Sequence, residues 1–385
     1  WKEFSVIRAP YQCLPTGFMD ETQIAQAKAT IHRSTYLMEY GACFADDSDG
    51  FFRRSLIESC VTNQPINTPV SGPVQFACEL QGDHRKKYIY GIDPASETDN
   101  FAIVVLECYG DHRRIVYSWT INRQELRQRM KNKGQTLERS FYVYCARKIR
   151  DLMKIFPTEN IVIDSQGGGH TIAETLRDIK ELEENEQPLL PYIKGGDDDV
   201  FWWEEADKPT DKEAGSHILH IVNFANAKFI YESNHGLRKD FEDKKILLPF
   251  FDSVALATSA AHDKIAHREH DTLEDAMMEI EELKDELSTI IHTQTTSGRD
   301  KWDTPEVKLP GGKKGRLRKD RYSALLIGNM VARCMINESL RPVYEARGGF
   351  AGQKRINSGS DKLYIGPDHI TKKMTGIYGK GVVRG

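Results

Sequence analysis

The stretch YIYGIDPASETDNFAIVV, residues 88–105, contains two apolar runs separated by a polar turn. Asp93 ends the first run, and Asp99 lies just before the second. A lone carboxylate is costly to bury at the end of an apolar strand, because nothing compensates its charge. A bound cation would provide that compensation. We therefore treat these two aspartates as candidate metal ligands.

The runs around this stretch predict a mixed sheet. Three segments rich in β-branched and aromatic residues, 88–92, 101–109 and 114–121, are typical of consecutive antiparallel strands. A helix is expected over 136–156, and the short apolar run NIVIDSQ predicts a buried strand over 160–166. This order of elements is that of an α/β, ribonuclease H-like fold, in which helices flank a mixed β-sheet.

The rest of the chain continues in α/β units, after an N-terminal part with one expected helix within 22–44. The expected later elements are a helix over 170–182, a strand over 189–194, a helix around 214–233, a strand over 244–250 and helices over 271–291 and 321–335. The segment NQPINTPVSGP, 63–73, predicts a linker. We divide the chain into an N-terminal linker segment (1–80), an α/β domain (81–340) and a basic, partly disordered tail (341–385).

Composition excludes several classes. The 385 residues are 39% hydrophobic and 29% charged, as in globular proteins with a core. No apolar run approaches 18 residues and no signal peptide opens the chain, so we expect no membrane span and a cytoplasmic location. Seven cysteines without a CxxC pair indicate neither a zinc site nor a disulfide framework. The net charge of −4 does not by itself indicate nucleic acid.

Three aspartates lie where a metal site would need them. Asp93 and Asp164 end two strands, and Asp320 begins a late helix. Neighbouring strands of an open sheet bring their ends together, and a helix packed on that sheet can point a third side chain at the same place. Crowded carboxylates raise each other's pKa, whereas Mg²⁺ or Mn²⁺ would make the cluster favourable. Two such ions about 3.5–4 Å apart support hydrolysis of a phosphodiester.

Each aspartate also has a structural explanation. Asp93 precedes Pro94 and could cap a turn, and Asp164 could cap the turn into the following glycines. Asp320 could be the N-cap of its helix. Only their joint placement favours a metal site.

The glycine-rich stretches do not indicate nucleotide binding. Gly167–Gly169 permit close backbone approach by a ligand, but QGGGHT lacks the dinucleotide spacing. GGKKG, 311–315, lacks the Lys-Ser/Thr ending of a phosphate-binding loop. No ATP hydrolysis is expected from this chain.

Four segments together resemble one family. They are GIDPASETDNFAIVVLE (91–107), IVIDSQGGG (161–169), RKDRYSALLIG (318–328) and the upstream TYLMEYGACFADDSDGFF (35–52). They are similar to the large terminase subunit of tailed bacteriophages, in its C-terminal nuclease portion. The resemblance implies a metal-dependent endonuclease that cuts double-stranded viral DNA during genome packaging, by two-metal hydrolysis with low sequence specificity.

The resemblance also implies roles for single residues. Asp93, Asp164 and Asp320 match the family's catalytic, metal-binding triad, and Asp99 matches a further acidic ligand found in some members. The implied cofactor is Mg²⁺ or Mn²⁺, as two ions. The implied partners are double-stranded DNA, the portal protein, the small terminase subunit and the ATPase domain of the same polypeptide, whose end would lie within 1–80. The implied location is the host cytoplasm.

The third motif departs from the family pattern. Many relatives have two adjacent acids there, whereas this chain has Lys319-Asp320-Arg321. This leaves the third ligand less firmly matched than the first two.

A basic segment surrounds the third aspartate. Its candidate DNA-binding residues are Lys308, Lys313, Lys314, Arg316, Arg318, Lys319 and Arg321. Such side chains contact phosphates and position DNA without reading its sequence. The alternative is an ordinary solvated loop.

Two other functions remain open at this point. Another ribonuclease H-like enzyme of nucleic acids, such as a resolvase or a transposase, would use the same carboxylates. A non-cleaving module that docks on DNA or on the portal would use the basic segment alone.

Overall fold

The computed structural model describes most of the chain. The described residues are 9–15, 17–30, 36, 40–42, 50–62, 66–68, 72–74, 80–94, 99–132, 141–193, 203–205, 214–265, 270–295, 298–308 and 314–339. The predicted tail, 341–385, lies outside them.

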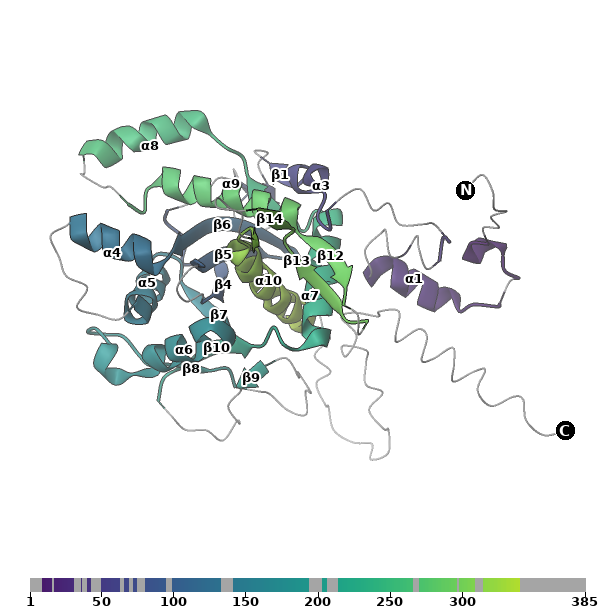
Figure 1. The fold of residues 1–385 in the computed structure, drawn as a ribbon, viewed down its shortest axis with the longest axis horizontal. Coiled ribbons are helices and arrows are strands. Elements are labelled where there is room, and N and C mark those ends of the chain that lie inside the picture. The colour runs from purple at the N-terminus through teal and green to yellow at the C-terminus, as the bar shows by residue number, and fades with distance from the viewer. Residues whose placement is uncertain are drawn as a thin grey trace.

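A nine-stranded mixed sheet forms the centre of the molecule (Figure 1). Its strands are β1 (Val61–Thr62), β4 (Lys87–Asp93), β5 (Phe101–Tyr109), β6 (His112–Ile121), β7 (Thr158–Asp164), β8 (Leu189–Pro191), β9 (Trp203–Glu205), β10 (Ser216–Val222) and β11 (Ile246–Pro249). Their spatial order is β1-β11-β6-β5-β4-β7-β10-β8, with β9 paired to β10. The strands β4, β5 and β6 are antiparallel neighbours, and β7 and β10 continue the sheet in parallel with β4. This is the predicted ribonuclease H-like arrangement.

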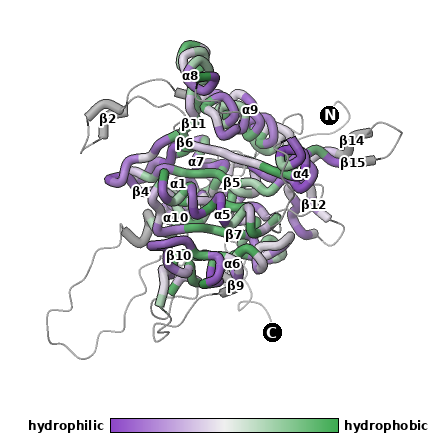
Figure 2. The backbone as a smooth tube through the Cα atoms, turned by 90° about the vertical axis from the view of Figure 1, so that its left-hand side faces the viewer, coloured by the Kyte–Doolittle hydropathy of each residue, from purple (hydrophilic) through white to green (hydrophobic). Residues whose placement is uncertain are grey.

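Helices cover the sheet. The described helices are α1 (Glu21–Thr30), α3 (Arg54–Glu58), α4 (Arg123–Asn132), α5 (Phe141–Ile155), α6 (Gly169–Arg177), α7 (Ala227–Glu242), α8 (Ser253–Ile265), α9 (Leu273–Thr289) and α10 (Asp320–Ser339). Three short 3₁₀ turns are η1 (Tyr11–Cys13), η2 (Gln166–Gly168) and η3 (Ile179–Glu181). Helix α10 crosses the central strands β4 and β5, and α7 and α9 pack beside it (Figure 1). The interior strands β5 and β7 are hydrophobic, whereas α9 is largely hydrophilic (Figure 2).

Three small hairpins complete the described structure. They are β2 (Ile66–Thr68) with β3 (Gly72–Val74), β12 (Ile291–Gln294) with β13 (Asp300–Asp303), and β14 (Glu306–Lys308) with β15 (Lys314–Arg316). The first lies within the segment 63–73 that the sequence predicts as a linker.

A glycine pair lets α10 lie directly on the sheet. Strand residues alternate between the two faces, so Gly91 and Tyr90 of β4 point in opposite directions. The Tyr90 hydroxyl donates to the Phe156 carbonyl just after α5. A Cβ on Gly91 would lie 1.9 Å from the Ala324 carbonyl oxygen of α10, and one on Gly328 would lie 3.2 Å from the Gly91 backbone. Helix and strand backbones therefore touch here, which fixes the start of α10 close to the end of β4.

One predicted element is wrong. The expected helix around 214–233 is instead strand β10 followed by α7, which begins after Asn226. The run SHILHIV pairs with β7 and β8 on its two sides, and the Asn226 side chain accepts from the N–H groups of Lys228 and Phe229. A short apolar run fits a buried strand or a buried helix equally well, and here the pairing of its neighbours decides.

Residues just before the predicted boundary at residue 80 pack with the sheet. Phe52 and Ile57 are fully buried in the main core, and β1 pairs with β11 at the edge of the sheet. The division at residues 80 and 340 stays a prediction.

No described helix has both the length and the apolar content that crossing a membrane requires.

Candidate active site

Two of the predicted aspartates lie side by side at the carboxyl ends of neighbouring strands. β4 and β7 are parallel, with Ile92 opposite Ile163, so the next residue of each strand is Asp93 and Asp164. Asp164 is buried, with 4% of its surface exposed, and Asp93 is partly exposed at the rim of the sheet. The strand-end placement predicted from the sequence is confirmed.

The third aspartate reaches the same place from α10. Asp320 is the first residue of the helix and is buried, with 7% of its surface exposed. The backbone N–H of Asn100, just before β5, donates to Asp320 Oδ2 at 2.8 Å. The Ser323 hydroxyl, one turn further along α10, hydrogen-bonds the Asp93 carboxylate. The start of α10 is therefore tied both to the entry of β5 and to the end of β4.

The charges of the three carboxylates act on one another. Burial raises the pKa of Asp93 well above its ordinary value, and the negative charges of Asp320 and Asp164 raise it further. The Ser323 hydrogen bond and the positive charge of Lys319 oppose this rise in pKa. The strong rise identifies Asp93 as a carboxylate held in a site of excess negative charge.

Asp320 shows the same pattern. Burial raises its pKa, the Asn100 hydrogen bond lowers it, and the charge of Asp99 raises it again. Asp99 itself is exposed at the end of the polar turn. Its charge thus acts on Asp320, whereas Asp93 experiences Asp320 and Asp164.

These residues fit a hard divalent cation in their chemistry. Mg²⁺ and Mn²⁺ prefer carboxylate oxygens, and a cation would remove the mutual repulsion that raises the pKa of Asp93. Among the described residues, no three acidic, His or Cys side chains stand close enough together to hold one ion as they are oriented. The carboxylates interact electrostatically without sharing a coordination sphere. Binding an ion would require them to turn toward one another.

A glycine shapes the strand end at Asp164. A Cβ on Gly169, the first residue of α6, would lie 1.8 Å from the Asp164 carbonyl oxygen. The N–H of Gln166 also donates to Asp164 Oδ1 at 3.3 Å. The glycines after Asp164 are therefore required by the tight turn itself, which is a structural reason beside the predicted access for a ligand.

A cluster of positive side chains lies beside the aspartates, and one carboxylate holds it together. Asp303 of β13 forms ion pairs with Lys301 at 3.0 Å, with Lys319 at 3.1 Å and with Arg316. The charges of Asp93 and Asp320 both act on Lys319. Three cations around one anion leave a net positive surface next to the acidic site.

The other predicted basic residues differ in position. Arg318 donates to Asn100 Oδ1 at 3.0 Å and is exposed, so it lies next to the acidic site. Lys308 and Lys314 pair across the β14–β15 hairpin through their backbones. Lys313 lies outside the described residues.

Arg321 does not fit its predicted contact with DNA. Its side chain is buried, with 6% of the residue exposed, and its guanidinium forms ion pairs with glutamates of α9. A guanidinium enclosed in this way does not face a DNA backbone. We exclude Arg321 from the DNA-binding set on this ground.

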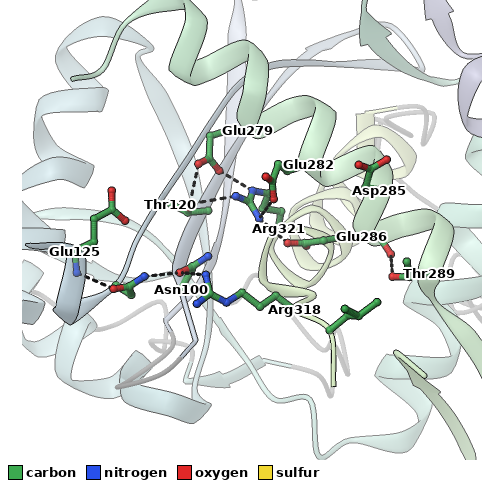
Figure 3. Close-up of a pocket in the computed structure, with 12 residues that line it drawn as sticks. Asn100, Thr120, Glu125, Glu279, Glu282, Asp285, Glu286, Thr289, Arg318 and Arg321 are labelled. Atoms are coloured by element: carbon green, nitrogen blue, oxygen red, sulfur yellow. Dashed lines mark hydrogen bonds and ion pairs between the residues drawn. The ribbon is translucent and has the colours of Figure 1, made fainter. Parts of the chain in front are cut away.

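Those glutamates line a cavity of about 380 Å³ beside α10 (Figure 3). Its charged lining consists of Glu125, Glu279, Glu282, Asp285, Glu286, Arg318 and Arg321. In the close-up, Arg321 points between Glu279 and Glu286 (Figure 3). The cavity therefore borders the helix that carries Asp320 on the side away from Asp93.

Sequence reasoning missed both groups of partner residues. Glu279, Glu282 and Glu286 recur at helical spacing, so an acidic stripe on α9 could have been found in the sequence. Lys301 and Asp303 carry no comparable signal, because two short hairpins bring them to the site.

The strand order and the convergent aspartates define the class: a ribonuclease H-like fold with an acidic site at the carboxyl ends of its central strands. No protein-family model matches the chain, and no curated protein matches it. Among solved structures, the large terminase nuclease of thermophilic phage G20c overlaps with 73% of this chain and 98% of its own, at 12% identity and a TM-score of 0.40. The same nuclease has been solved with bound magnesium.

Two whole large terminases also overlap with the chain. That of a second thermophilic bacteriophage does so over 82% of this chain and 53% of its own, at 8% identity and a TM-score of 0.42. That of bacteriophage HK97 does so over 72% and 43%, at 14% identity and a TM-score of 0.38. The chain thus spans about half of these two proteins. The matches have the same description as the family that the sequence motifs resemble, while the functional argument rests on this chain's own residues.

Proposed function

We propose that this chain is a divalent-metal-dependent endonuclease that cuts double-stranded DNA, of the kind found in large terminases. One observation supports it most: Asp93, Asp164 and Asp320 converge from two strands and a helix, and their charges act on one another. A protein gains nothing in stability from such mutual repulsion, whereas a cation-binding site requires it.

The proposed roles follow from position. Asp93, Asp164 and Asp320 hold Mg²⁺ or Mn²⁺, and Asp99 contributes from the exposed turn as a further acidic group. Two bound ions would supply activation of a water for in-line attack and stabilisation of the leaving oxygen. Asn100 keeps Asp320 oriented through its backbone N–H, and Ser323 does the same for Asp93.

DNA would lie along the positive cluster. Lys301, Arg316 and Lys319 surround Asp303, and Arg318 lies on the other side of Asp320. Contacts of this kind go to phosphates, so binding would be independent of sequence and sensitive to salt. The hairpin lysines Lys308, Lys313 and Lys314 would extend the same surface.

The packaging context belongs to the same proposal. It comprises cleavage of viral DNA in the host cytoplasm, and partners in the portal protein, the small terminase subunit and an ATPase domain ending within 1–80. The nuclease would then be the unit 81–340, followed by the tail 341–385. The sequence motifs, and not the contacts described above, carry this part.

A plasmid assay tests the proposal. Purified protein with Mn²⁺ or Mg²⁺ should linearise and degrade plasmid, and a chelator should stop the reaction. Asp164→Asn should abolish cleavage while the protein stays folded, and Asp151→Asn, on the exposed face of α5, is the matched control. Cleavage that persists in the chelator or in Asp164→Asn would contradict the proposal. Much faster cutting of branched than of linear DNA would move the assignment to the resolvase class.

A further inference from the structure

The first turn of α10 is held in place from outside the helix. The early N–H groups of a helix have no partners within it. Here the N–H of Tyr322 donates to Glu286 Oε2 of α9 at 2.9 Å, while Asp320 accepts from the N–H of Asn100. An anionic side chain at a helix N-terminus is also favoured by the helix dipole. Glu286 therefore stabilises the turn that presents Asp320.

Arg321 joins this turn to the rest of the fold. Its Nε donates to Glu279 Oε2 at 2.6 Å, and its Nη1 donates to Glu286 Oε1 at 2.7 Å. Its Nη2 lies 3.4 Å from the Thr120 hydroxyl of β6, which itself donates to Glu279 at 2.9 Å. One guanidinium thus connects α10, α9 and the sheet (Figure 3).

The cavity explains why polar contacts are needed here. The side of α10 that faces α9 near Arg321 borders an open space of about 380 Å³ rather than a packed apolar layer. Apolar packing therefore fixes the middle of the helix at Gly91 and Gly328, but not the orientation of its first residue. That orientation depends on the ion pairs of Arg321 and on Glu286.

We propose that Arg321 and Glu286 are positioning residues, which hold Asp320 in the direction required for binding a metal ion. The inference rests on the proposed nuclease function. Side chains that orient a metal ligand typically change metal affinity by about 10–100-fold when they are altered. The network should therefore affect metal binding more than it affects DNA binding, because the phosphate contacts lie on other residues.

The test measures Mn²⁺ binding without turnover, by the loss of the free-Mn²⁺ electron paramagnetic resonance signal. Glu286→Gln keeps the size of the side chain but weakens its pairing with Arg321, and should raise the Kd for Mn²⁺ about 10-fold or more. Asp285→Asn removes the same charge from the same cavity, but Asp285 pairs with Arg54 of α3, so its Kd should equal that of the unaltered protein. DNA affinity, measured with Ca²⁺ in place of Mn²⁺, should be unchanged in both variants.

Arg321→Lys keeps the positive charge but loses the bridging geometry, and it should show the same rise in Kd if Glu286→Gln does not fold. A wild-type Kd in the folded variants, or an equal rise in Asp285→Asn, would overturn the positioning role. A protein that neither binds Mn²⁺ nor cuts plasmid before any substitution would instead overturn the proposed function.

Discussion

Gly91→Ala should separate the two elements that form the candidate site. Gly91 lies two residues before Asp93, and its Cα faces the α10 backbone four residues after Asp320. An added Cβ would lie 1.9 Å from the Ala324 carbonyl oxygen, where ordinary contacts begin at 3.4 Å. Relief requires α10 to retreat from β4 by 3.4 − 1.9 = 1.5 Å if the strand stays in place.

The size of the effect follows from this displacement. Overpacking of a core costs about 1–3 kcal/mol, and a clash with backbone atoms on both sides should fall near the upper end. A shift of about 1 Å in a catalytic group can lower the rate about 10²-fold. Gly91→Ala should therefore lower the free energy of unfolding by about 3 kcal/mol and reduce Mn²⁺-dependent cleavage by about two orders of magnitude.

Gly328→Ala is the matched control, because it adds a methyl group to the other side of the same contact. Its Cβ would lie 3.2 Å from Gly91, which needs an adjustment of only a few tenths of an ångström. Alanine also favours the helix by about 1 kcal/mol. Urea unfolding should thus show a large fall in midpoint for Gly91→Ala and a small change for Gly328→Ala. Equal midpoints for the two variants, with wild-type cleavage in both, would refute the close helix–strand contact.

Three further predictions concern charge. Asp164→Asn should raise stability in the absence of metal, because it removes a charge that raises the pKa of Asp93, and should abolish cleavage; a fall in the urea midpoint would contradict the repulsion. Burial lowers the pKa of His220 from 6.5 to about 3, so the unfolded chain binds a proton that the folded chain excludes, and stability is lost as pH falls from 6.5 toward 3. Between pH 7 and 5 this loss is about 2 kcal/mol, and unfolding of His220→Gln at both pH values should lack it. Arg316→Ala and Arg318→Ala should each reduce the slope of log Kd for DNA against log salt by about 1, and an unchanged slope would remove that residue from the interface.

The central part of the fold could be predicted because its sequence pattern is local. The runs that became β4, β5, β6 and β7 are apolar, β-branched and bounded by turns, so their type and order follow from neighbouring residues. The strand β10 could not be predicted in this way. Its seven residues suit helix and strand alike, and pairing with two distant strands determines the outcome.

The candidate site divides in the same manner. Asp93, Asp164 and Asp320 are visible in the sequence because strand ends and a helix start identify them. Arg321 illustrates the opposite case, since it belongs to a basic run, yet glutamates 35 and 42 residues away surround it. No local pattern distinguishes a cation that faces DNA from one that faces α9. The role of Asp303 likewise depends on two hairpins whose pairing is set by tertiary structure.

The most direct measurement is anomalous scattering from a crystal soaked in Mn²⁺. The account predicts one or two anomalous peaks within coordination distance of carboxylate oxygens of Asp93, Asp164 and Asp320. Peaks only at other carboxylates, or none at a concentration that supports cleavage, would contradict it.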